Sequence, residues 1–344
     1  MSEVVPEVLK AINRQRVSKT PIWLMRQAGR YMKSYRNLRE KYSILELCRN
    51  PELSYRVTMQ PIERFPNIDA AIIFSDILVL LQSMGLRLHF ASGEGPIIEN
   101  PIKDYGDIET LRQIDAKEDL SFVLKAINLV SRELPREKAL IGFCGAPFTL
   151  ASYAIEGGSS KSFFKTRDLM NSQPDAWNNL MVKLSDAIKE YALEQSNAGA
   201  DIIQIFDSWV GHISREEYIK YVSPYSFRIF KYLKDQNVPT IHFSTGTSDF
   251  LDLIANAGGD VISVDWKIEI DKAWEKIGHG RSIQGNLDPN KLAGSKKDLE
   301  ESARTILKKV QGKNGFIFNL GHGVLPNTPE ENVEHLIELV HHFN

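Results

Sequence analysis

A dense group of cationic side chains directly follows the first apolar run of the sequence, PIWLM. The charged residues that follow it are Arg26, Arg30, Lys33, Arg36, Arg39 and Lys41, with Glu40 as the one acid among them. Guanidinium groups bind carboxylates through paired hydrogen bonds, so this group would suit a ligand with several negative charges. Arg26 and Arg30 would share one face if the chain turns helical after Met25. The alternative is a solvated basic helix, but Ala28 and Gly29 would let a ligand approach the backbone closely.

A single carboxylate interrupts the longest apolar stretch of the chain. Asp76 lies within AIIFSDILVLL, residues 71–81. A buried carboxylate is costly unless it is paired or hydrogen-bonded. Asp76 therefore either forms a structural ion pair with a neighbouring arginine or lies in an apolar pocket, where it faces a cation or N–H donors.

The elements that would position these side chains are eight short apolar runs, each typical of a buried parallel strand. The runs are residues 21–25, 70–75, 139–145, 201–206, 239–244, 260–266, 282–286 and 315–321. Helical patterns lie between them, with capping boxes predicted at Ser214 with Glu217 and at Thr328 with Glu331. Strand alternating with helix eight times predicts an α/β protein, a single-domain (β/α)₈ TIM barrel over residues 1–344. Because the runs are unevenly spaced, a doubly wound open sheet remains the alternative.

Polar residues follow most of these runs, at the strand ends where a barrel carries its chemistry. In chain order they are Arg26, Asp76, Asp207, Ser208, Ser244, Asp265, Asn286 and His322. Each could simply mark the end of a strand, but around a ring they would line one common mouth. Tyr153 fits packed aromatic core equally well. His322, between two glycines, is poorly placed for a packed core and favours a site role.

Composition and charge exclude several classes of function. The 344 residues carry a formal charge of −2, which argues against a nucleic-acid partner. The N-terminus lacks a secretion-signal pattern, and no apolar stretch reaches the roughly 20 residues of a membrane helix. The only cysteines, Cys48 and Cys144, do not resemble a disulfide framework. We therefore expect a cytoplasmic protein with no membrane partner.

Two long motifs resemble the signatures of the uroporphyrinogen decarboxylase family. PIWLMRQAGRYM matches the family pattern P-x-W-x-M-R-Q-A-G-R at every fixed position, and GFCGAPFTLASYAIEGGSS (142–160) resembles the second signature. IIFSDILVLLQSMG, GEGP (93–96) and FNLGHGVLPNTP are also similar. The resemblance runs from about residue 5 to the C-terminus, and two long motifs in the right order make it specific.

The resemblance implies a cytoplasmic, homodimeric (β/α)₈ barrel that needs no cofactor or metal. As a carboxy-lyase of the haem and chlorophyll pathway, it would convert the four acetate arms of uroporphyrinogen III to the methyl groups of coproporphyrinogen III. The substrate-binding residues implied by motif position are Arg26, Gln27, Ala28, Gly29, Arg30, Arg39, Asp76, Tyr153, Ser208 and His322.

Two of these residues are expected to be catalytic. Asp76 would accept the pyrrole N–H groups and stabilise positive charge on the ring, while Arg26 would bind the carboxylate near the reacting arm. Phe74 and Phe148 are candidates for apolar walls that desolvate this carboxylate. Asp207 stands where eukaryotic members often have Glu, and it receives no role.

Two rival functions remain open. Zinc-dependent methyltransferases of the same superfamily need a His-x-Cys ligand pair, but IHFS offers His242 with Ser244 in place of cysteine. A non-catalytic carrier of tetrapyrroles or other polyanions would keep the arginines. Such a carrier has no use for Asp76, whose charge would repel its ligand, so Asp76 is the residue that distinguishes the two readings.

Overall fold

The computed structural model describes residues 4–91 and 95–343. Its main element is a seven-stranded sheet, paired in parallel, with the order β1-β4-β5-β6-β7-β8-β9 in the described part of the chain. The strands are β1 (Ala70–Ile72), β4 (Ala139–Gly145), β5 (Ile202–Asp207), β6 (Thr240–Ser244), β7 (Val261–Ser263), β8 (Ser282–Leu287) and β9 (Phe316–Leu320). Seven of the eight predicted runs are thus confirmed as strands. The spatial order follows the chain order, so the doubly wound alternative, whose order reverses at a switch point, is wrong.

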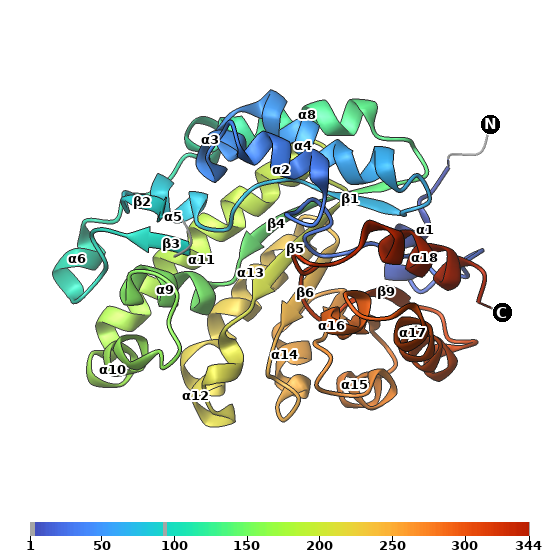
Figure 1. Ribbon diagram of the computed structural model, residues 1–344. Coiled ribbons are helices and arrows are strands. Elements are labelled where there is room, and N and C mark those ends of the chain that lie inside the picture. Colours follow the sequence, from blue (N-terminus) through green and yellow to red (C-terminus); the bar gives the residue numbers. More distant parts are fainter. Residues whose placement is uncertain (1–3, 92–94, 344) are drawn as a thin grey trace.

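Helices between the strands surround the sheet (Figure 1). The longer ones are α4 (Pro51–Arg64), α8 (Ser121–Glu133), α9 (Pro147–Glu156), α10 (Phe164–Ser172), α11 (Pro174–Asn197), α13 (Ser223–Asp235), α17 (Lys296–Val310) and α18 (Glu330–His341). The shorter ones are α1 (Glu7–Ile12), α2 (Lys33–Arg39), α3 (Ile44–Arg49), α5 (Val79–Ser83), α6 (Tyr105–Glu109), α7 (Ala116–Asp119), η1 (Val210–His212), α12 (Arg215–Tyr221), α14 (Leu251–Ala257), α15 (Ile270–Ile277) and α16 (Pro289–Leu292). None of the helices in the two described ranges has the combination of length and apolar surface that crossing a lipid bilayer demands.

One of the two predicted capping boxes is confirmed. Ser214 accepts from the backbone N–H of Glu217 at 3.1 Å, and the Glu217 side chain accepts from the Ser214 N–H at 2.8 Å. The prediction at Thr328 is wrong because Pro329 adopts an extended ψ of 133°, so α18 begins at Glu330. The first turn of α18 has no side-chain cap, and the Thr328 hydroxyl has no hydrogen-bond partner in the described part of the chain.

The first apolar run forms an isolated parallel bridge, between Ile22 and Phe318, where a full strand was predicted. On one side, the Phe318 N–H donates to Pro21 O at 2.8 Å. On the other side, the Asp69 N–H donates to Ile22 O at 2.9 Å, and the Asp69 carboxylate accepts from the Ile22 N–H at 2.8 Å. The run therefore lies between β9 and the residue that precedes β1, the two edges of the sheet.

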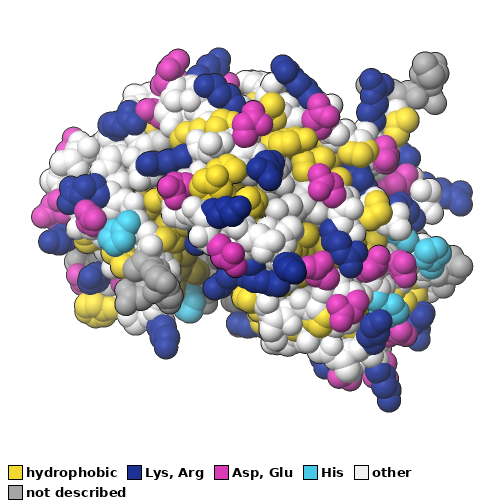
Figure 2. Space-filling model, turned by 45° about the horizontal axis from the view of Figure 1, so that its top comes forward, with side chains coloured by type: hydrophobic (Ala, Val, Ile, Leu, Met, Phe, Trp, Pro, Cys, Tyr) yellow, Lys and Arg dark blue, Asp and Glu magenta, His cyan; other side chains and the backbone are white. Residues whose placement is uncertain are grey.

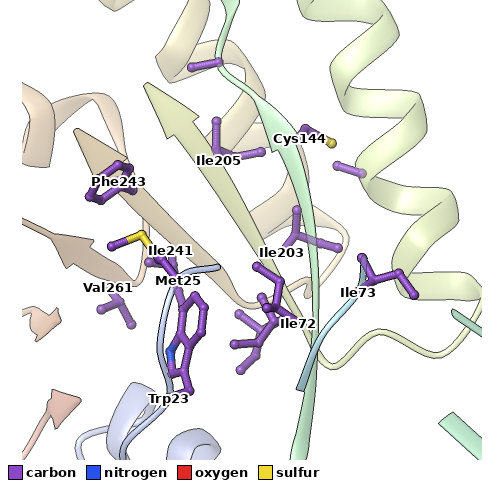
Figure 3. Close-up of a cluster of buried hydrophobic side chains, with 14 of the residues drawn as sticks. Trp23, Met25, Ile72, Ile73, Cys144, Ile203, Ile205, Ile241, Phe243 and Val261 are labelled. Atoms are coloured by element: carbon purple, nitrogen blue, oxygen red, sulfur yellow. The ribbon is translucent and has the colours of Figure 1, made fainter. Parts of the chain in front are cut away.

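Side chains inside the sheet show that it curls strongly. Gln284 on β8 donates through Nε2 to Gln204 Oε1 on β5 at 3.1 Å, although these strands are not neighbours. The indole of Trp23 donates to Gln284 Oε1 at 2.8 Å. Figure 3 shows Trp23 in one buried cluster with Ile205 and Ile241, so the core fills the concave side of the sheet.

A small antiparallel hairpin, β2 (Leu88–Ala91) with β3 (Gly95–Ile98), was not predicted. An isolated antiparallel bridge from Ile97 to Gly158 joins it to the end of α9. Two residues of the GEGP motif, Gly93 and Glu94, lie outside the described residues. The hairpin matters here because it forms one wall of the cavity described next.

Candidate functional site

A cavity of about 470 Å³ lies at the carboxyl end of the sheet. The predicted site residues that line it are Arg26, Ala28, Gly29, Arg30, Asp76, Tyr153, Ser208 and His322. A second cavity of about 410 Å³, between β8 and α17, is lined by none of the ten predicted residues. The loops after β1, β5 and β9 contribute to the first cavity, which is where parallel α/β proteins bind their ligands.

The prediction that every polar strand-end residue lines one mouth is wrong. Ser244 hydrogen-bonds to Thr247 at 2.7 Å, and Asp265 accepts from the Gly246 N–H at 2.6 Å. Asn286 donates to Asp265 O at 2.8 Å. These side chains brace neighbouring loops because buried polar groups need partners. Asp207 likewise turns inward and accepts the Thr149 hydroxyl at 2.9 Å.

The basic loop is not helical. The expectation that Arg26 and Arg30 share one face of a helix is therefore wrong. Arg26 has a φ of 62°, a left-handed conformation that interrupts any helix, and α2 begins only at Lys33. Both guanidinium groups are nevertheless exposed and line the same cavity. Within residues 4–91 and 95–343, neither is ion-paired with a carboxylate. They remain available for an anionic ligand.

The other two predicted residues, Gln27 and Arg39, point elsewhere. Gln27 is buried, and its side-chain Nε2 donates to Ala70 O at 3.0 Å. The backbone carbonyl of Gln27 accepts from the Tyr31 hydroxyl at 2.7 Å. The Gln27 side chain thus holds the loop in shape. Arg39 donates to Tyr42 O at 2.7 Å and is not a cavity-lining residue. Their part in substrate binding stays a prediction.

Close packing explains the two glycines that flank His322. A Cβ on Gly323 would come within 2.4 Å of Arg26 Cδ, because the arginine side chain lies directly across this glycine. A Cβ on Gly321 would come within 2.4 Å of the Trp266 backbone nitrogen. Only glycine allows both approaches. The sequence Gly-His-Gly therefore places Arg26 and His322 side by side.

The tautomer of His322 follows from its own loop. Nδ1 accepts the Gly323 N–H at 2.8 Å, so the proton of the neutral ring is on Nε2. Burial, and then the nearby charge of Arg26, lowers the pKa of His322 to about 4. At neutral pH the ring is an uncharged hydrogen-bond donor at the cavity wall.

Asp76 is the only acidic residue among the described residues that line this cavity. Its Oδ1 accepts the Leu78 N–H at 2.8 Å. Burial raises the pKa of the carboxyl above its usual range, against the opposing effects of this hydrogen bond and of Arg26. One carboxylate therefore lies in the same cavity as Arg26 and Arg30, the arrangement expected from the sequence.

Aromatic side chains form an apolar wall beside these polar groups. Phe206 packs edge-on against Phe143, with centroids 5.6 Å apart, and against Phe243 at 5.5 Å. All three line the cavity together with Phe74. Sequence reasoning missed Phe206 and Phe243, although each directly precedes a polar strand-end residue. Alternation along a strand turns such neighbours to opposite faces.

Two further differences concern the apolar lining. Phe148 was expected in the wall, but it is fully buried and packs on Trp177 at 6.2 Å, outside the cavity. Phe90 and Pro96, from the unpredicted hairpin, line the cavity instead. The signal that could have found them is the alternation of Leu88, Phe90 and their neighbours before a glycine-containing turn.

Tyr153 is both core and cavity wall, which reconciles its two interpretations. Its ring stacks on Trp209 with centroids 3.8 Å apart and planes 31° apart. Burial raises the pKa of the phenol to about 12, so the hydroxyl stays protonated. Beside it, the Ser208 carbonyl accepts the Thr245 hydroxyl at 2.5 Å. Both hydroxyl-bearing side chains line the cavity as predicted.

The residues considered as zinc ligands have other partners. His242 Nδ1 is 3.1 Å from Gly258 O, and its ring packs on Phe230 at 4.4 Å. In the described part of the chain, no three His, Cys, Asp or Glu side chains lie close enough together to hold a metal ion. The zinc-dependent alternative thus lacks its ligand set among these residues.

Positive charge is concentrated locally on the surface. Figure 2 shows a run of Lys and Arg side chains across the middle of one face, with Asp and Glu scattered over the same face. This mixture agrees with the formal charge of −2 for the whole chain. A local basic region suits a small anionic ligand better than an extended one.

Comparison with known proteins gives a consistent result over nearly the whole chain. The family model described as uroporphyrinogen decarboxylase (URO-D) matches residues 6–343. A uroporphyrinogen decarboxylase of Carboxydothermus hydrogenoformans is 48% identical over 336 residues, which cover 98% of this chain and 96% of that protein. One of Sorangium cellulosum is 47% identical over 333 residues, which cover 97% and 95%.

Solved structures with the same fold carry other names. A methyltransferase from Methanosarcina mazei superposes with a TM-score of 0.80 at 21% identity, covering 97% of this chain and 96% of that one. A B12-independent methionine synthase from Shewanella gives a TM-score of 0.54 at 13% identity, covering 84% and 87%. At these identities the similarity concerns the fold alone.

Proposed function

This chain belongs to the uroporphyrinogen decarboxylase family, and on that premise we propose that it converts uroporphyrinogen III to coproporphyrinogen III. It is a carboxy-lyase of porphyrin biosynthesis, and each acetate arm loses its carboxyl group as CO₂ and becomes a methyl group. The observation that carries the proposal is one carboxylate, Asp76, in a cavity where Arg26 and Arg30 are the other charged side chains among the described lining residues.

Capture of the substrate needs donors for its eight carboxylates. Arg26 and Arg30, exposed on the cavity wall, offer two charged forks for bidentate binding. The hydroxyls of Tyr153 and Ser208, and Nε2–H of His322, add neutral donors around the same space. These groups would bind peripheral carboxylates and fix the orientation of the macrocycle.

The chemistry needs a temporary acceptor for the electron pair that the departing CO₂ leaves behind. A proton added to a ring carbon makes the pyrrole a cation. The bond between the methylene and the carboxylate then breaks, CO₂ leaves, and the electron pair neutralises the ring as an exocyclic double bond. A second proton adds to the methylene carbon, and loss of the first one restores the pyrrole. Each CO₂ released therefore consumes one proton.

Asp76 stabilises the ring cation in this scheme. The Leu78 N–H occupies its Oδ1, which leaves Oδ2 for the pyrrole N–H groups. A carboxylate in a poorly hydrated cavity interacts strongly with a developing positive charge. Arg26 binds the carboxylate of the reacting arm. Phe143, Phe206 and the other aromatic residues desolvate that arm, which favours loss of CO₂.

Three properties of the whole molecule belong to the same proposal. The first apolar run counts as the missing strand of a closed (β/α)₈ barrel. The bonds of Phe318 on β9 to Pro21 and Trp23, and those of Asp69 to Ile22, support this. Residues 1–344 form one domain. The protein acts as a cytoplasmic homodimer, and sedimentation at several concentrations would reveal a dimer through twice the monomer mass of 39.0 kDa.

The decisive experiment uses purified, chelator-treated protein incubated without oxygen with uroporphyrinogen III. Chromatography of the oxidised products should show seven-, six-, five- and finally four-carboxyl porphyrins. Complete recovery of the eight-carboxyl compound, with a known decarboxylase active under the same conditions, would contradict the proposal. Retention of unchanged uroporphyrinogen by the protein in that case would favour the carrier.

A further inference from the structure

A buried carboxyl group stands directly behind the cavity wall and has no part in the scheme above. Asp207 is the last residue of β5 and is 0% exposed. Its Oδ1 accepts the Thr149 hydroxyl at 2.9 Å, whereas Oδ2 has no hydrogen-bond partner in the described part of the chain. The next residue, Ser208, lines the cavity. Burying a carboxyl group with one oxygen unpartnered is costly, so the group calls for an explanation.

Thr149 joins this carboxyl group to the cavity wall. Its hydroxyl donates to Asp207 and accepts the Trp209 N–H at 3.4 Å. Thr149 and Tyr153 are four residues apart on α9, so they lie on the same face of that helix. The face is therefore fastened to the end of β5 twice, by the hydroxyl of Thr149 and by the Tyr153 ring stacked on Trp209 at 3.8 Å.

A second aromatic ring, that of Phe163, also packs on Trp209. The two ring centroids are 4.9 Å apart, and Phe163 has a φ of 50°, a left-handed backbone conformation that is unfavourable for a bulky residue. Such strain persists only where the surroundings impose it, and it is concentrated at functional sites. The Trp209 indole thus has little freedom, and the Tyr153 ring that rests on it is fixed with it.

We propose that Asp207 is a positioning residue that fixes Tyr153 and Ser208 at the cavity wall through Thr149 and Trp209. The inference deepens the proposed function and rests on it. Asp207 is not a cavity-lining residue, so it acts through these neighbours and does not touch the substrate. What the arrangement requires of Asp207 is a buried acceptor for the Thr149 hydroxyl. Burial raises the pKa of Asp207 to about 7, and either protonation state supplies that acceptor.

Two pairs of variants, one at Asp207 and one at Thr149, test the hydrogen bond between these residues. Asp207→Ala removes the acceptor and Thr149→Val removes the hydroxyl. Each should raise KM about tenfold with kcat nearly unchanged, because the loss of one hydrogen bond weakens substrate and transition-state binding alike. Asp207→Asn and Thr149→Ser keep the required atoms and should stay within about threefold of the unchanged protein. If Asp207→Ala does not fold, Thr149→Val tests the inference alone.

A matched control lies at the other end of the same strand. Asp201, just before β5, accepts the Leu140 N–H at 2.7 Å. Asp201→Ala should lower the unfolding temperature without changing KM. In a Tyr153→Ala background, Asp207→Ala should add little to KM, because the ring that Asp207 holds in place is already absent.

Three results would overturn the inference. One is an unchanged KM in both folded Asp207→Ala and Thr149→Val. A second is an effect of Asp207→Ala that is fully additive with Tyr153→Ala. The third is a loss in Asp207→Asn as large as in Asp207→Ala, which would show that an ionisable carboxyl group, and not merely an acceptor, is required. Failure of the proposed function is distinct, since the unchanged protein itself would then release no CO₂ from uroporphyrinogen.

Discussion

The two ends of strand β1 carry aspartates with opposite surroundings. Before the strand, Asp69 is 5% exposed and contacts Lys19 Nζ at 2.9 Å, His341 Nε2 at 2.7 Å and the Ile22 N–H at 2.8 Å. These partners hold its pKa below the usual range although burial alone would raise it. After the strand, Asp76 has one backbone hydrogen bond and a raised pKa.

The difference between the two carboxylates teaches how one residue type serves two purposes. Both lose hydration, but only Asp69 regains its interactions from the protein. Asp69 therefore contributes to stability at the amino end of the sheet, where barrels carry structural residues. Asp76 keeps unsatisfied hydrogen-bonding capacity at the carboxyl end, where a substrate can use it. Fewer protein partners, and not deeper burial, distinguish Asp76, the carboxylate that we propose to be catalytic, from Asp69.

The largest expected effect is on turnover. Asp76→Asn removes the negative charge opposite the ring cation and should lower kcat about 100-fold or more. Its unfolding temperature should be equal or higher, because a carboxyl group with a raised pKa costs stability when ionised. A stopped assay and a thermal melt measure the two quantities. Near-normal turnover would remove Asp76 from the mechanism.

The same substitution at Asp69 should lower stability and leave the chemistry intact. Asp69→Asn leaves Lys19 without its counter-charge and takes the carboxylate away from the His341 ring, so it should lower the free energy of unfolding by about 3 kcal/mol. The kcat of the folded protein should change little. Denaturant titration gives the measurement, with Asp235→Asn as control. That substitution removes the exposed pair with Lys231 and should cost less than about 1 kcal/mol. Equal losses in both variants would contradict the comparison.

Because the pKa of Asp76 is raised and that of Asp69 is lowered, activity should be lost at a higher pH than the stability that Asp69 provides. Activity that needs ionised Asp76 should fall about tenfold per pH unit below its raised pKa. The contribution of Asp69 to stability lasts to lower pH, because it is lost only as pH falls through a lowered pKa. Reversible inactivation with an unchanged circular dichroism spectrum is therefore expected. Asp207→Asn should retain this decline; its disappearance there would assign the decline to Asp207.

A smaller effect is expected from the cation that faces Asp76. A Cβ at Gly323 would meet Arg26 Cδ at 2.4 Å, so Gly323→Ala should displace the guanidinium and raise KM about fivefold. Gly280→Ala is the control, because no atom lies within 4 Å of a Cβ built there. Kinetics of both variants measure the difference. An unchanged KM in Gly323→Ala would show that the position of Arg26 is not restricted.

Most of the fold could be predicted from the sequence because each buried parallel strand corresponds to a compact run of apolar residues. The exceptions depend on contacts with distant residues. Residues 21–25 have the composition of a strand, yet the Asp69 carboxylate takes the place of a ladder partner at Ile22. The hairpin of β2 and β3 has a weaker pattern, since its alternation covers only a few residues.

The site was predictable where a residue type conflicts with its neighbours, as Asp76 does within an apolar stretch. The site was not predictable where the direction of a side chain decides whether it lines the cavity. Ser244 and Asn286 occupy strand ends as Ser208 does, but they turn into neighbouring loops. The sequence does not indicate the role of Asp69, because nothing near it in the chain reveals its distant partners Lys19 and His341. The sequence assigns no role to Asp207 either, since its partner Thr149 is 58 residues away.

The contact between His341 and Asp69 has a consequence for how the chain reaches its final state. These residues are 272 positions apart. Contacts of such long range form late, because the entropy of closing the intervening loop opposes them. During synthesis, β1 leaves the ribosome long before α18 exists. The sheet can assemble strand by strand, but its two edges are secured only when the last helix arrives, so shortening α18 should slow the final step of folding more than it weakens the early ones.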